Sequence, residues 1–231
     1  MLRLVIFDCD GVLVDSEPIS TRVFAEELNR AGVDWPASRV AVELTGLSDR
    51  SCIELVERTT GRRLPAGFLA RVRDRTYSAF RAGLRPIDGI EGALERIGLP
   101  SCIASSGDHE RMRLTLGLTG LLDRFRGRIF SAEDVARGKP FPDLFLHSAR
   151  ALGVDPREAV VVEDSMPGVR AARAAGMTVL GFAAAADGAR LARDGARVFG
   201  DMRELPELIE SVRTASANRV GEDESAQLSS D

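Results

Sequence analysis

Short apolar runs separated by longer polar and helical stretches make up most of the chain outside residues 18–82. The first run is Leu2–Phe7, and five more follow at Ser101–Ala104, Arg128–Ser131, Ala159–Val162, Thr178–Phe182 and Arg197–Phe199. Apolar runs of this length are typical of strands buried in a parallel sheet. Because helical stretches alternate with the runs, the pattern predicts an α/β fold with a Rossmann-like parallel sheet as its core.

The stretch from Pro18 to about Ala82 differs, because its apolar residues recur at helical spacing. Two such stripes are Ile19, Val23 and Leu28, and Leu69, Val72, Thr76 and Phe80. We therefore expect an all-helical cap domain, residues 15–84, inserted into an α/β core domain formed by residues 1–14 and 85–212. The second crossing between the two contains Gly83 and Pro86, which suit a hinge.

The composition narrows the classes of function open to the chain. A net charge of −4, with acids interspersed among the arginines, argues against a nucleic-acid-binding surface, and no apolar run approaches a membrane span. The cysteines Cys9, Cys52 and Cys102 form no CxxC motif and cannot all pair, which favours a reducing cytoplasm.

Residues 214–231 contain few apolar side chains and are predicted to be a disordered tail. We expect a monomer or a weak homodimer.

Side chains of the types used in catalysis and metal binding follow the predicted strands. They are Asp8 and Asp10 behind the first run, Ser105 behind the second, Lys139 between glycine and proline breakers, and Glu163 and Asp164 behind the fourth run. Because the carboxyl ends of parallel strands meet at one edge of a sheet, we expect these residues to come together there. Carboxylates this close repel unless a cation or a shared proton relieves them. The set therefore predicts an oxygen-rich site for Mg²⁺.

Lys139 is the only lysine among the 31 basic residues of the chain. An ammonium is a compact point charge on a thin stem, whereas a guanidinium is a broad fork. A single lysine in a chain that otherwise uses arginine therefore indicates a site too narrow for a guanidinium.

In order and spacing, four segments resemble the motifs of the haloacid dehalogenase-like phosphohydrolases. They are Asp8-Cys9-Asp10-Gly11-Val12, Ser105 after a strand, Gly138-Lys139-Pro140-Phe141-Pro142-Asp143, and Glu163-Asp164-Ser165. The resemblance runs from about Leu2 to Ile209. It is greatest with the branch that has a helical cap after the first motif, which includes phosphoglycolate phosphatases, β-phosphoglucomutases and 6-phosphogluconate phosphatases.

The residues and the resemblance assign the same roles. Asp8, rigid at a strand end, is the expected nucleophile and would form an aspartyl-phosphate, while Asp10 is the expected general acid and base. Ser105 is expected to donate a hydrogen bond to a phosphoryl oxygen, and Lys139 to neutralise charge on Asp8 and the phosphate. The expected Mg²⁺ ligands are Asp8, the main-chain carbonyl of Asp10, Asp164, and Glu163 directly or through water.

Several activities remain open. Asp10 argues against dehalogenation, because halide-releasing members of the family lack the second acid. Ser20 stands where β-phosphoglucomutases carry a histidine, which argues against a mutase. We therefore predict a phosphatase of a small phosphorylated sugar or sugar acid, resembling those that act on 6-phosphogluconate. Phosphoglycolate phosphatase is the runner-up, a β-phosphoglucomutase-like mutase is a further alternative, and a receiver-like phospho-acceptor module is the non-enzyme alternative.

Substrate specificity is expected to depend on residues where the cap meets the core. The candidate contacts are Ser16, Glu17, Ser20 and Arg50 from the cap, and Ser106, Gly107 and His109 from the core. A guanidinium at Arg50 suits a substrate carboxylate or a second phosphate, with a solvent-facing arginine as the alternative. For His109 the alternative is a residue that only begins a helix.

Overall fold

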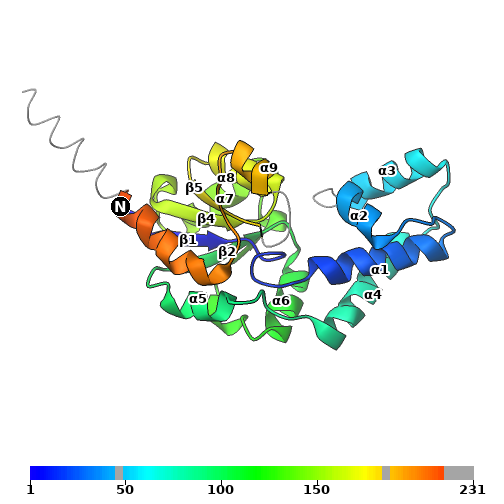
Figure 1. The fold of residues 1–231 in the computed structure, drawn as a ribbon, viewed down its shortest axis with the longest axis horizontal. Coiled ribbons are helices and arrows are strands. Elements are labelled where there is room, and N and C mark those ends of the chain that lie inside the picture. Colours follow the sequence, from blue (N-terminus) through cyan, green and yellow to red (C-terminus); the bar gives the residue numbers. More distant parts are fainter. Residues whose placement is uncertain (45–48, 184–187, 216–231) are drawn as a thin grey trace, which may run out of the picture.

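The computed structural model describes residues 1–44, 49–183 and 188–215. Six parallel strands form one sheet in the order β3-β2-β1-β4-β5-β6 (Figure 1). The strands are β1 (Leu4–Phe7), β2 (Ser101–Ser105), β3 (Ile129–Ser131), β4 (Ala159–Glu163), β5 (Thr178–Phe182) and β6 (Arg197–Phe199). The predicted α/β fold with a parallel sheet is confirmed.

Helices cover both faces of the sheet (Figure 1). One face is covered by α5 (Ile90–Arg96), α6 (His109–Leu118) and a helix over residues 205–215, and the other by α7 (Asp143–Ala151), α8 (Met166–Ala174) and α9 (Gly188–Arg193). Short 3-10 turns occupy Asp123–Phe125, Ala132–Asp134, Pro156–Glu158 and Met202–Glu204. The layers explain why the strands read as continuous apolar runs, since both faces are buried.

Successive side chains of β1 belong in turn to the two apolar clusters on opposite faces of the sheet. Val5 and Phe7 belong to the cluster with α5 and α6, whereas Leu4 and Ile6 belong to the cluster with α7 and α8. All of them are fully buried, because successive side chains of a strand point to opposite faces of the sheet.

Between β1 and α5, the described residues form four helices: α1 (Glu17–Arg30), α2 (Ala37–Leu44), α3 (Asp49–Thr60) and α4 (Phe68–Gly83). We refer to residues 17–83 as the helical insertion. It lies on the side toward which β1 points (Figure 1). Leu28, Trp35, Val56 and Phe68 form part of a buried cluster within it, separate from the two clusters of the sheet.

The two connections between the insertion and the sheet run side by side. The amide of Asp15 donates to the carbonyl of Arg85 at 2.9 Å, and that of Ile87 donates to the carbonyl of Leu13 at 3.0 Å. Tyr77 and Phe80 of α4 belong to the cluster around α5 and α6, so the end of α4 packs against the core.

The ends of some elements differ from the sequence prediction. The strand expected from Leu2 begins at Leu4, that expected from Arg128 begins at Ile129, and β2 and β4 extend by one residue to include Ser105 and Glu163. The last helix continues through residue 215, so the predicted tail does not begin at residue 214, and its remainder lies outside the described residues. In the described part of the chain, no helix combines the length and apolarity needed to cross a membrane.

Candidate active site

The carboxyl end of β1 places Asp8 at the centre of one edge of the sheet. β1 lies between β2 and β4, so the strand order reverses there, and open parallel sheets bind ligands at such a point. Phe7 pairs with Val162, and the Asp8 amide donates to the Val162 carbonyl at 3.0 Å. This register brings Asp8 beside Glu163, the last residue of β4.

Lys139 joins these two acids. Its Nζ lies 2.9 Å from Asp8 Oδ1 and 2.5 Å from Glu163 Oε1, and the side chain is only 3% exposed. Burial alone would lower the pKa of Lys139, but the charges of Asp8 and Glu163 raise it above its usual value. The only lysine of the chain is therefore a buried ammonium between two carboxylates.

The second oxygen of Glu163 is bound to the start of α8. Oε2 accepts hydrogen bonds from the amides of Asp164 at 3.1 Å and Ser165 at 3.0 Å, and from Ser165 Oγ at 2.8 Å. Ser165 also caps the helix by accepting from the Gly168 amide, as its position before the helix predicts. Because both oxygens of the fully buried Glu163 have partners, its carboxylate is held in one orientation toward Lys139.

Asp8, Glu163 and Asp164 form a group with the chemistry of a metal site. Each offers a carboxylate oxygen, and these oxygens lie within 4.8 Å of one another. Gly11 gives Asp164 its room: it has a φ of +76°, and a Cβ there would lie 2.0 Å from Asp164 Oδ2. Hard oxygen donors in a small cluster fit Mg²⁺, so the residues present suit the ion that the sequence predicts.

Burial and mutual repulsion disfavour the ionised forms of the carboxylates in this group. Burial raises the pKa of Asp8 to about 7, with Glu163 adding to the effect and Lys139 opposing it. Burial, followed by the charges of Glu163 and Asp8, also raises the pKa of Asp164 well above its usual value. A divalent cation relieves both effects, because it stabilises the ionised carboxylates.

Asp10 is held by a residue that sequence reasoning missed. Arg111 Nε lies 2.9 Å from Asp10 Oδ2, and Arg111 Nη2 lies 2.9 Å from Asp10 Oδ1, which is a bidentate pair. Ser16 Oγ, fully buried, donates to the same Oδ1 at 2.5 Å. Burial alone would raise the pKa of Asp10, but Arg111 and the hydrogen bond from Ser16 lower it below its usual value.

The sequence offers no signal that separates Arg111 from the other arginines. It lies in the first turn of the helix that follows Ser105, and only folding shows that this turn faces Asp10. The carboxylate of Asp10 therefore lies in the Arg111 fork and outside the Asp8, Glu163 and Asp164 group. This leaves its main-chain carbonyl as the predicted ligand.

Ser105 and Gly107 lie beside this pair. Ser105 is 1% exposed, and its Oγ accepts a hydrogen bond from the Gly107 amide at 3.2 Å. A Cβ on Gly107 would lie 3.4 Å from Arg111 Cδ, 3.5 Å from Ser105 Oγ and 3.7 Å from Asp10 Oδ2. The structure thus brings the predicted phosphate donor, the predicted acid and Arg111 around one point.

The predicted contacts from the insertion divide into two groups. Ser20 Oγ lies 3.5 Å from Arg111 Nη2, and burial followed by the charge of Asp10 raises the pKa of Glu17, so both lie near the site. The structure does not bring Arg50 to it. The Arg50 side chain is 89% exposed and pairs with Glu54 one turn along α3, which is the solvent-facing alternative for this residue.

The predicted contacts from the core also divide. Gly107 lies at the site, whereas Ser106 is exposed. His109 is the first residue of α6, and its Nε2 lies 2.9 Å from Asp134 Oδ1. The imidazole is therefore engaged with the turn that follows β3 rather than with the carboxylate group.

All three cysteines are buried, and none of them forms a disulfide. Cys9 lies between the two aspartates in the chain, but burial, followed by the charges of Asp10 and Asp8, raises the pKa of its thiol well above the usual value. A protonated thiol in an apolar cluster packs and does not act as a nucleophile.

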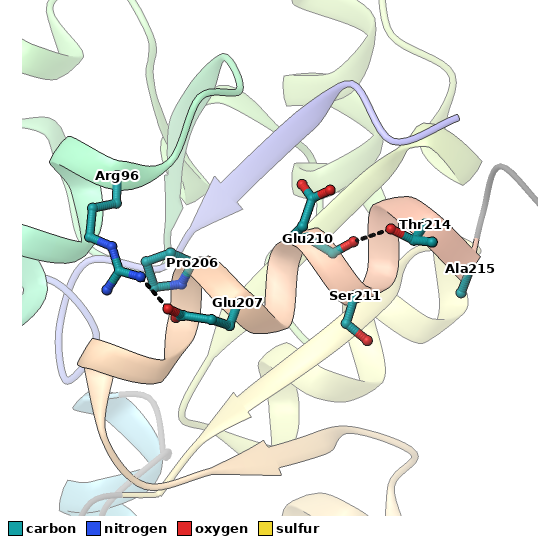
Figure 2. Close-up of a pocket in the computed structure, with 7 residues that line it drawn as sticks. All are labelled: Arg96, Pro206, Glu207, Glu210, Ser211, Thr214 and Ala215. Atoms are coloured by element: carbon teal, nitrogen blue, oxygen red, sulfur yellow. Dashed lines mark hydrogen bonds and ion pairs between the residues drawn. The ribbon is translucent and has the colours of Figure 1, made fainter.

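A separate hollow lies on the surface where α5 meets the last helix (Figure 2). Its lining residues are Arg96, Pro206, Glu207, Glu210, Ser211, Thr214 and Ala215. Arg96 and Glu207 form an ion pair across it. None of the carboxylates at the strand ends lines this hollow, so it is not part of the candidate active site.

Comparisons with known proteins agree with the geometry. The sequence model of the haloacid dehalogenase-like hydrolases matches residues 2–176. The 6-phosphogluconate phosphatase of Escherichia coli (strain K12) is 30% identical over 208 residues, which cover 90% of this chain and 94% of the relative.

Solved structures give the same picture. A conserved haloacid dehalogenase-like protein of unknown function from Agrobacterium tumefaciens strain C58 is similar with a TM-score of 0.85 and 37% identity, covering 92% of this chain and all of the other. A hydrolase of the same family from Deinococcus radiodurans R1, solved with bound phosphate and sodium, has a TM-score of 0.77 and 32% identity, covering 88% and 93%.

The contact between Glu163 and α8 gives a testable prediction at Gly168. A Cβ there would lie 1.9 Å from the Glu163 carboxylate, so Gly168→Ala must displace the group that holds Lys139. We expect the free energy of unfolding to fall by about 1–3 kcal/mol in a denaturant titration. Gly92→Ala is the matched control, since nothing lies within 4 Å of that exposed helical position. Equal unfolding midpoints for Gly168→Ala and wild type would contradict the packing described.

The raised pKa of Asp8 gives a second prediction, on the pH dependence of Mg²⁺ binding. Below its pKa of about 7 the Asp8 carboxyl holds a proton that the cation must displace, whereas above it the carboxylate is free. Mg²⁺ should therefore bind more tightly at pH 8 than at pH 6, by up to about tenfold per pH unit for each proton released. Calorimetric titration at the two pH values measures this, and equal affinities would exclude Asp8 as a ligand.

Proposed function

The chain belongs to the haloacid dehalogenase-like hydrolases and is a phosphoric monoester hydrolase, and we propose that it is a Mg²⁺-dependent phosphatase of a small phosphorylated sugar or sugar acid. The observation that carries the proposal is the Lys139 ammonium between Asp8 and Glu163, beside the free carboxylate of Asp164. This arrangement supplies a carboxylate nucleophile together with positive charge for an anionic substrate.

In the first half-reaction, an oxygen of the Asp8 carboxylate attacks phosphorus. The bond between phosphorus and the ester oxygen breaks, and the leaving oxygen takes a proton from Asp10. Because Arg111 lowers the pKa of Asp10, this carboxyl must first leave Arg111 and take up that proton from solvent. The products are an aspartyl-phosphate on Asp8, an alcohol, and an ionised Asp10. Ser105 donates a hydrogen bond to a phosphoryl oxygen, and Lys139 neutralises charge on Asp8 and the phosphate.

In the second half-reaction, the Asp10 carboxylate takes a proton from a water molecule as its oxygen attacks phosphorus. The bond between phosphorus and Asp8 breaks, which restores the Asp8 carboxylate and the protonated Asp10 and releases inorganic phosphate. Glu163 acts as a positioning residue in both steps, because its bonds to the start of α8 hold Lys139 in place.

Mg²⁺ would be held by Asp8, Asp164 and the main-chain carbonyl of Asp10, with Glu163 contributing directly or through water. When bound, it supplies positive charge that allows the anionic nucleophile and the anionic phosphate to approach. The similarity to a hydrolase solved with bound phosphate supports an anion site in the same fold.

The substrate class rests on two observations. The relative from Escherichia coli is a 6-phosphogluconate phosphatase, and the matching region covers nearly all of both chains. Ser20, on α1 near Arg111, is not the histidine of the mutases, which favours hydrolysis over phosphate transfer to a sugar. We further propose that residues 15–84 form the cap over the leaving group and that the protein, whose buried cysteines form no disulfide, acts in the cytoplasm.

The proposed function predicts repeated release of inorganic phosphate from 6-phosphogluconate when Mg²⁺ is present. Asp8→Asn should lower kcat by about a thousandfold or more, because the amide has the shape of the carboxylate without its nucleophilicity. Asp15→Asn, an exposed aspartate nearby, is the control and should retain wild-type kcat. The proposal fails if exhaustive chelation leaves full activity or if each chain releases phosphate only once.

Lys139→Arg tests the narrowness of the site. A guanidinium is wider than the ammonium that fits between Asp8 and Glu163, so it displaces one of the two carboxylates. Misplacement by about 1 Å can lower kcat on the order of a hundredfold, and far-UV circular dichroism should stay unchanged. Arg150→Lys, at an exposed position on α7, is the matched exchange and should be harmless. Wild-type kcat in Lys139→Arg would rule out the proposed role of the lysine.

A further inference from the structure

Arg111 lies on α6 of the core and contacts both parts of the protein. Its guanidinium carbon is 5.0 Å from the centroid of the Phe80 ring, on α4, and its Nη2 is 3.5 Å from Ser20 Oγ, on α1. The side chain is 22% exposed. The fork is therefore oriented at the boundary between the insertion and the strand ends, where a leaving group would lie.

The hydrogen bonds of Asp10 do not fit its proposed role as the acid. Arg111 occupies both carboxylate oxygens, and Ser16 adds a further bond to Oδ1. Before Asp10 can face the leaving oxygen, it must exchange at least one bond from Arg111 for another partner. A partly buried guanidinium that loses a carboxylate needs another anion, because an unpaired buried charge is costly.

We propose that Arg111 selects substrates whose leaving group carries a carboxylate, by transferring its two hydrogen bonds from Asp10 to that carboxylate. This inference rests on the proposed phosphatase function and names its substrate class, the phosphate monoesters of hydroxy acids. The fork already holds a carboxylate in bidentate geometry, so another planar anion with two oxygens replaces Asp10 with the least loss. Ser16 keeps Oδ1 of Asp10, and Oδ2 becomes free to face the leaving oxygen.

The position of Arg111 fits a substrate bound through its phosphate. The Arg111 side chain, Ser105 Oγ and Asp10 Oδ2 surround the same point above Gly107, at 3.4 to 3.7 Å from it. A leaving group that extends from a phosphate on Ser105 therefore passes Asp10 and reaches Arg111. In this arrangement the core itself provides a specificity residue, and Arg50 of the insertion faces solvent.

Matched substrates test the proposal in the full chain with Mg²⁺. One pair is 6-phosphogluconate and sorbitol 6-phosphate, and the other is 2-phosphoglycolate and 2-hydroxyethyl phosphate; each pair exchanges a carboxylate for a hydroxymethyl group. We expect wild type to prefer the carboxylate in kcat/KM for at least one pair. In Arg111→Gln that preference should fall about 10- to 100-fold, with a smaller fall in Arg111→Lys, which cannot form two parallel bonds.

The ratio within a pair separates selection from a structural role, because a variant that merely distorts the site lowers both members by the same factor. Arg113→Gln, at an exposed position on the same helix, is the control and should leave the ratio unchanged. If Arg111→Gln is inactive, the ratio in Arg111→Lys decides. An unchanged ratio, with wild type hydrolysing both members, overturns the inference and leaves the phosphatase function standing. Failure of wild type to hydrolyse any of the four overturns both.

Discussion

The ion pairs of Lys139 with Asp8 and Glu163 are the interactions on which the rest of the candidate site depends. The register of β1 and β4 brings the two carboxylates together at buried strand ends, where they would repel. One compact ammonium offsets that repulsion and holds both groups at hydrogen-bonding distance. Removing it would leave two buried anions uncompensated, a cost of about 3–5 kcal/mol when one partner of such a pair is lost.

Two adjacent acids, Glu163 and Asp164, acquire different roles through packing. Glu163 accepts three hydrogen bonds from the two residues that precede α8, and its other oxygen accepts from Lys139. Asp164 lies over Gly11, where the missing Cβ gives its carboxylate room beside Asp8. The small residues Gly11 and Gly168 thus decide which acid holds the lysine and which is open to a cation.

Arg111 connects this group to the helical insertion. It binds the second acid of the first motif, lies over an aromatic ring of α4 and approaches Ser20 of α1. A substrate anion that binds the Arg111 guanidinium would replace Asp10 there. It would also lie at the boundary between the core and the insertion. Substrate choice and the freedom of the general acid would then depend on one side chain, which is a more direct coupling than a contact from the insertion alone would provide.

The sequence by itself determined the parallel α/β fold, because buried strands and amphipathic helices have different apolar periods. It also singled out Asp8, Lys139, Glu163 and Asp164, since strand ends converge and a lone lysine stands apart. Tertiary structure decided what lies across from each residue: it paired Arg111 with Asp10 and left Arg50 with Glu54. An arginine in a helix has no local pattern that reveals its partner. That partner is set by how α6 packs against the sheet and the insertion, which no spacing along the chain encodes.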